Sequence, residues 1–116
     1  MQITNFKDMY LAELQELASM ERQLASALPQ MAEVASHHEL KNAFTRHGEE
    51  TETQRQRLAS ILQKHGASAP THTDQAMQAL LTETKKMVSL LKGDDLRDAG
   101  LIASSCDISK TAVREA

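Results

Sequence analysis

Apolar side chains recur at steps of three and four residues through the first third of the chain, and this spacing constrains the fold more than any other feature of the sequence. The stripe consists of Tyr10, Leu14, Leu17, Leu24, Leu28 and Met31. Residues with this spacing share one face of an α-helix, so an amphipathic helix is predicted over residues 5–35. Pro29 lies inside the pattern and lacks a backbone donor, which predicts a kink or a break at residues 25–29.

Three further segments follow, separated by turn residues. A helix is predicted over residues 39–64, after a short turn at residues 36–38, and Gly66 ends it. The next helix starts at a cap, Thr73 or Asp74, and runs to about residue 91. Asp94 or Asp95 caps a fourth segment, whose apolar pattern fades over residues 104–116.

Composition supports an all-α fold. Gly, Pro and aromatic residues are scarce, and the abundant residues are those that favour helices. The 116 residues suit one domain, and 41% of them are hydrophobic, which is enough to form a core. The prediction is therefore a single domain over residues 1–116, an antiparallel helical bundle with an incomplete fourth helix.

Charge and cysteine content exclude several classes of protein. The formal net charge is −3 and acidic and basic residues are interspersed, so the chain lacks the basic surface of a nucleic-acid-binding protein. No segment approaches the roughly 18 to 20 apolar residues of a membrane span. Cys106 is the one cysteine, so no internal disulfide can form, and a reducing cytoplasm is the expected compartment.

A band of polar side chains interrupts the apolar stripe of the second helix, within the stretch "RHGEETETQRQRL" at residues 46–58. His47, Gln54 and either Glu50 or Thr51 occupy positions where apolar residues are expected. Polar groups at such positions need partners in the interior. The band therefore points to a function or to a compensating partner.

Two other helices also carry a glutamate near the midpoint of the stripe, Glu21 in the first and Glu83 in the third. A rise of about 1.5 Å per residue puts Glu21 and Glu50 at a similar depth in an antiparallel pair. The loop before the third helix is long enough for Glu83 to reach the same depth. The spacing predicts one layer of three carboxylates.

Three ionised carboxylates facing one another would destabilise a core unless something neutralises them. Protonation, pairing with Arg or Lys, and a bound cation are the three solutions. Oxygen ligands beside an imidazole suit iron or manganese, so Glu21, Glu50 and Glu83 are candidate metal ligands. His47 and Gln54 are candidates for further ligands or for hydrogen-bond partners of the ligands. The alternative is that each glutamate lies on the flank of its stripe and extends to solvent.

Four blocks of the sequence resemble one family. They read "FKDMYLAELQELASMERQLASALPQMAEVAS", "LKNAFTRHGEETETQRQRL", "AMQALLTETKKMV" and "LRDAGLIAS". Over residues 6–104 their order and spacing resemble the YciF/YciE-like ferritin-like proteins of bacteria. The resemblance implies a ferritin-like helical bundle, often dimeric, in a stress-associated cytoplasmic protein. It also implies that Glu21, Glu50 and Glu83 match carboxylates of a two-metal site, in which two helices supply Glu-x-x-His pairs.

The chain departs from that family pattern in two places. Thr53 stands where the histidine partner of Glu50 is expected. The fourth segment ends in "CDISKTAVREA", with Cys106 and Lys110 among the residues that replace amide, carboxylate and imidazole groups, and a fifth helix is absent. The expectation is a truncated family member without assigned catalytic residues. It keeps half of a metal site, binds one iron or manganese ion weakly and lacks efficient oxidase turnover.

A second expectation comes from a different class of protein. A bundle with a shortened fourth helix leaves an apolar groove exposed, and a second copy of the chain is the simplest cover for it. On this interpretation the chain is a non-catalytic structural or stress-response protein, and homodimerisation completes the bundle.

Overall fold

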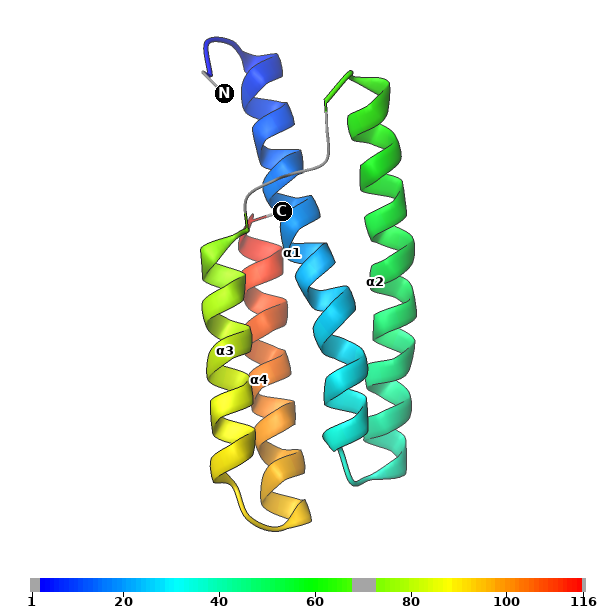
Figure 1. Cartoon of the computed structure of the whole chain (residues 1–116), viewed down its shortest axis with the longest axis vertical. Helices are drawn as coiled ribbons and strands as arrows, with labels where there is room; N and C mark the ends of the chain where they lie inside the picture. The colour runs from blue at the N-terminus through cyan, green and yellow to red at the C-terminus, as the bar shows by residue number, and fades with distance from the viewer. Residues whose placement is uncertain (1–2, 68–72, 116) are drawn as a thin grey trace.

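The computed structural model describes residues 3–67 and 73–115, with side chains as far as Ile108. The described residues form four α-helices. The helices are α1 (Phe6–Val34), α2 (His38–Lys64), α3 (Gln75–Leu90) and α4 (Asp94–Glu115). Each helix runs antiparallel to the one before it, and the described residues contain no strand (Figure 1). The predicted all-α antiparallel bundle is confirmed. Within the described ranges, no helix is long and apolar enough to cross a membrane.

Side-chain caps set the N-terminal ends of α1 and α3. The Asp8 backbone N–H donates a hydrogen bond to Asn5 Oδ1 (2.9 Å), and the Met77 N–H donates one to Asp74 Oδ2 (2.9 Å). Each bond satisfies a donor that has no partner inside its own helix. Of the two caps predicted for α3, Thr73 and Asp74, the structure uses Asp74.

α1 continues through Pro29 as one helix, so the predicted break does not occur. Proline removes a single hydrogen bond from the helix interior. Leu24, Leu28 and Met31 are buried on both sides of it, and the burial of three large apolar side chains outweighs the missing bond.

α4 is longer than the sequence pattern indicates. It extends over 22 residues to Glu115, so the prediction of an incomplete fourth helix is not confirmed by the backbone. No proline or glycine follows Gly100, and nothing in the composition interrupts the helix. Leu101 and Ile108, seven residues apart, are both buried and hold α4 on the core. The side chain of Lys110 lies outside the described residues.

The four helices form two hairpins that meet along α1. α1 packs against α2, and the α3–α4 hairpin packs against another side of α1 (Figure 1). A lower core forms where all four helices meet, and its buried members include Met20, Leu28, Phe44, Met77 and Leu101. An upper core lies between α1 and α2 and consists of Leu11, Ala18, Leu58 and Leu62. The upper end of the α1–α2 hairpin therefore projects beyond α3 and α4 (Figure 1).

Hydrogen bonds at two places tie the hairpins together. The Asp74 N–H donates to Ser19 Oγ (2.7 Å), where α3 begins beside the middle of α1. The Asp98 carboxylate of α4 accepts from the Ser36 and His37 N–H groups (2.8 and 2.9 Å), which precede α2. These contacts fix which turn of α1 faces which turn of α3. They therefore set the depth of each side chain in the bundle.

Candidate functional site

Glu21 is the one predicted ligand that the fold buries. The residue is 9% exposed, and its Oε2 atom has no hydrogen-bond partner among the described residues. Burial raises the pKa of this carboxyl above its usual value, because the charged form loses its hydration. Such an oxygen is available to a proton, a donor or a cation.

α2 presents its predicted ligands to solvent. His47, Glu50 and Gln54 are all exposed, whereas Thr51 is 1% exposed and fills the core-facing position. The buried residues Phe44, Thr51 and Leu58 follow one another at steps of seven. The sequence left Glu50 and Thr51 as alternatives for this position, and the structure places Thr51 there.

α3 repeats this arrangement. Glu83 is exposed, and Thr84 beside it is buried, with its Oγ1 donating to the Leu80 carbonyl (2.8 Å). Met77 and Thr84, again seven residues apart, are the buried pair of this helix. A threonine satisfies its hydroxyl on its own helix and buries a methyl group, so it is less unfavourable in a core than a glutamate.

Glu21 and Glu50 lie at different levels along the axis of the bundle, as the contact between α1 and α2 indicates. Gly48 lies against Leu28, since a Cβ atom at Gly48 would be 3.5 Å from Leu28 Cβ. α2 runs antiparallel to α1, so Glu21, seven residues before Leu28, is level with Arg55. Glu50 lies five residues from that level, which is roughly 7 Å along the helix axis.

Glu83 also lies away from the level of Glu21. α3 runs parallel to α1, and it starts with Asp74 beside Ser19 (Figure 1). Glu83, nine residues after Asp74, is therefore level with Leu28, roughly 10 Å below Glu21. Within one copy, the three carboxylates do not form the single layer that the sequence predicted: one is buried and two face solvent.

The donor set does not fit a two-metal centre within a single copy. In the part of the chain that the structure describes, no three His, Cys, Asp or Glu side chains are grouped so that they could hold a metal ion. A bridged metal pair needs several carboxylates that converge from four helices. Glu21 by itself has the chemistry of one ligand to a hard cation.

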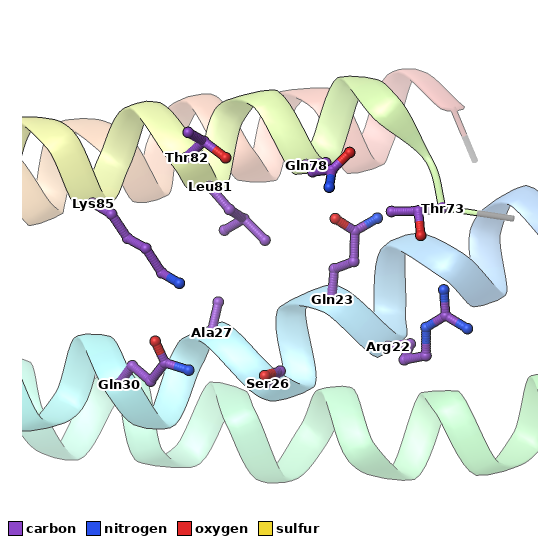
Figure 2. Close-up of a pocket in the computed structure, with 10 residues that line it drawn as sticks. All are labelled: Arg22, Gln23, Ser26, Ala27, Gln30, Thr73, Gln78, Leu81, Thr82 and Lys85. Atoms are coloured by element: carbon purple, nitrogen blue, oxygen red, sulfur yellow. The ribbon is translucent and has the colours of Figure 1, made fainter.

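A groove lies between α1 and α3, and the sequence pattern did not locate it. Its upper half has a cavity volume of about 480 Å³, and the polar side chains of Arg22, Gln23 and Lys85 extend into it (Figure 2). Its lower half has a volume of about 410 Å³ and is lined mainly by apolar side chains, including Met31 and Val88. Both halves share the lining residues Ala27, Gln30, Leu81 and Lys85, so we call the whole the α1–α3 groove.

Comparison with known proteins finds relatives over nearly the whole chain. A family model described as "Domain of unknown function (DUF892)" matches residues 5–113. Protein YciF of Escherichia coli strain K12 is 28% identical over 106 residues, which make up 90% of this chain and 64% of that protein. The chain therefore spans 64% of the length of this relative.

Two solved structures share the arrangement of helices. YcfI of Rhodopseudomonas palustris, described as a candidate structural protein, superposes with a TM-score of 0.91 at 25% identity, over 98% of this chain and 73% of that one. The E. coli stress protein YciF superposes with a TM-score of 0.88 at 25% identity, over 97% of this chain and 72% of that one. The helical bundle described above is thus shared with both.

Proposed function

Since the chain belongs to the DUF892 family, we propose that it is a non-catalytic structural protein of the stress response that works as a self-associated helical bundle in the cytoplasm. The names of two similar proteins support this role. The E. coli protein is called a stress protein, and the R. palustris protein is described as a candidate structural protein. The resemblance to YciF-like proteins, predicted from four blocks of the sequence, is confirmed.

The apolar surface that the bundle leaves uncovered is the observation that carries this proposal. Phe6, Met9 and Tyr10, on one face of α1, are 85%, 47% and 48% exposed. Neighbouring exposed apolar side chains such as these mark sites of association. A second copy of the chain brings a matching amount of apolar surface to the contact, as in most soluble homo-oligomers.

The positions of the predicted ligands support a structural rather than a catalytic role. Glu50 and Glu83 lie in solvent on different helices, and Thr51 and Thr84 fill the core positions beside them. The core thus packs as the core of a scaffold does, and the Thr84 hydroxyl bonds to the Leu80 carbonyl of its own helix.

Sedimentation velocity of the full chain tests self-association. The expected result is a homodimer whose population grows with protein concentration, and a monomer at every concentration would overturn the proposal. Oxygen or peroxide consumption with added Fe(II) tests the non-catalytic part. Turnover above that of a heat-unfolded control would overturn it.

Metal binding is a second candidate function, and the buried Oε2 of Glu21 is the observation that favours it. A single iron or manganese ion there would neutralise a charge whose burial is unfavourable. Glu50, Glu83, His47 and Gln54 are the other ligands that the sequence predicted, and all four are exposed. They would have to reach this ion from outside the core.

Metal analysis of protein purified with Fe(II) or Mn(II) separates these arrangements. The expected result is up to one ion per chain in the wild type, lost in Glu21→Gln and retained in Glu50→Ala and Glu83→Ala. Loss in all three variants would instead favour the shared carboxylate layer predicted from the sequence. A wild-type metal content equal to that of Glu21→Gln would overturn metal binding at this residue.

A further inference from the structure

We propose that the first turns of α1 in one copy dock into the α1–α3 groove of a second copy. The docking element is residues 6–13, which we call the N-terminal segment. This inference rests on the self-association proposed above and names the two surfaces that meet. It is argued from the apolar lining of the groove, its charge and the exposed face of the segment.

The lower half of the groove is an apolar surface that the bundle leaves open. Met31 and Leu101 are 6% and 1% exposed and form its floor, while Val34 is 37% exposed and lies at its edge. Its volume of about 410 Å³ is that of a site for bulky side chains. An apolar occupant with two or three large side chains fits this half.

The groove carries positive charge. Arg22 and Lys85 line its upper half, and none of the described residues that line either half bears a carboxylate, although the chain has 16 acidic residues. Lys85 makes no salt bridge with any residue in the described ranges. In Figure 2 its side chain extends across the groove toward α1. An occupant with a carboxylate at this level is therefore complementary in charge.

The N-terminal segment has the matching chemistry. Phe6, Met9 and Tyr10 are 85%, 47% and 48% exposed, and their spacing of three and four residues puts them on one face of α1. Glu13, one turn further, is also exposed and forms no salt bridge within the described part of the chain. The segment thus presents an apolar face followed by an acid.

The spacing of these groups agrees with that of the groove. Phe6 and Glu13 are seven residues apart, and so are Val34 at the apolar end of the groove and Ala27 in its polar half, about 10 Å in each case. Phe6 placed at Val34 puts Glu13 near Ala27, within reach of Lys85. The docked segment then runs antiparallel to the α1 that receives it. A two-fold axis produces this orientation, so each copy gives one segment and receives one.

The area involved is that of a specific interface. Three large side chains with these exposures offer roughly 350 Å² per segment, and two reciprocal contacts bury roughly 1,400 Å² when both sides are included. This value lies within the range of standard-sized protein interfaces.

Charge reversal tests the register of the docked segment. Glu13→Lys and Lys85→Glu are each expected to weaken the dimer by at least about tenfold in Kd, because each places like charges opposite one another. The double variant restores the opposite charges and is expected to recover the wild-type Kd to within about threefold. Glu83→Lys is the matched control, an exposed acid of α3 outside the groove. Equal weakening by the double variant and the single variants would overturn the docking.

Mixing two defective variants tests the reciprocal contact. Phe6→Ser removes the apolar end of the segment, and Val34→Asp places a charge at the apolar end of the groove. Each variant alone is expected to be monomeric with the helical circular dichroism of the wild type. A mixture is expected to form a heterodimer, because one of its two contacts is intact. Wild-type dimers that tolerate every variant would overturn the docking but keep self-association, whereas a monomeric wild type would overturn both.

Discussion

The lower and upper cores differ in the number of helices that close them. In the lower core, residues from all four helices meet, and Met20 and Met77 are completely buried. In the upper core, the described residues come from α1, α2 and the chain just after α2, with Leu11 at 7% and Leu58 at 9% exposure, and Phe6 is 85% exposed at the start of α1. The same amphipathic pattern runs through both regions of α1. An apolar stripe therefore shows which face will be buried but not what covers it.

Removing a large side chain from each core is the change with the largest expected effect. Leu28→Ala is expected to lower the free energy of unfolding by about 3 kcal/mol, since the side chain is 2% exposed among four helices. Leu58→Ala is expected to lower it by about 2 kcal/mol, because fewer neighbours lose contacts. Urea unfolding followed by circular dichroism measures both. Equal losses would show that the upper core is closed in solution as well.

The next largest effect is expected from removing the hydrogen bond between the Asp74 N–H and Ser19. Ser19→Ala leaves the Asp74 N–H without its acceptor in a buried position, which is expected to destabilise the fold by about 1–2 kcal/mol. Ser26→Ala, two turns further along α1 and exposed, is the matched control. A loss from Ser19→Ala no greater than that of the control would mean that packing alone positions α3 on α1.

Glu21→Gln is expected to stabilise the metal-free protein by on the order of 1 kcal/mol at neutral pH. The pKa of Glu21 is raised by burial, so the folded state binds the proton more tightly than the unfolded state. The penalty in the wild type is therefore fully present above the raised pKa and is lost as the pH falls to the ordinary value of 4.5. The difference between variant and wild type should disappear below that pH. A difference that does not change with pH would rule out a charged Glu21 as its cause.

Asp98→Ala is expected to have the smallest effect, a lower urea midpoint at neutral pH. The backbone N–H groups of Ser36 and His37 hold the pKa of Asp98 below its usual value. The stabilisation is present above the unfolded-state pKa and is lost as the pH falls through the lowered value. Asp95→Ala removes an exposed charge from the first turn of α4, three residues before Asp98, and serves as the control. Identical midpoints for both variants at all pH values would contradict the prediction.

The helices and their ends were predictable because local chemistry decides them. A cap at Thr73 or Asp74, a turn before α2 and a stop at Gly66 were each predicted from the residues that form them, and α1 and α2 begin and end within a residue of the predicted positions. The length of α4 was harder to predict, because its apolar stripe is weak while its composition remains helical.

The candidate site was less predictable, because it depends on rotation and depth. Adjacent residues lie about 100° apart around a helix axis. The apolar face of α2 is wide enough that either Glu50 or Thr51 could point to the core. The heptad steps through Phe44, Thr51 and Leu58 were the signal that favoured threonine. The level of Glu83 along the bundle depends on where α3 packs on α1. The hydrogen bond between Asp74 and Ser19 fixes that position, and these residues are too far apart in the sequence for a local pattern to reveal it.

The small contact between the two hairpins is expected to determine which part of the molecule unfolds locally. α3 and α4 pack closely on each other but meet α1 over a smaller surface, with hydrogen bonds at Ser19 and Asp98 as local anchors. Such a division creates units that open at different free energies. The amide protons of α3 and α4 should exchange with solvent together, as one subglobal opening. Those in the lower part of α1 and α2 should persist until the whole chain unfolds.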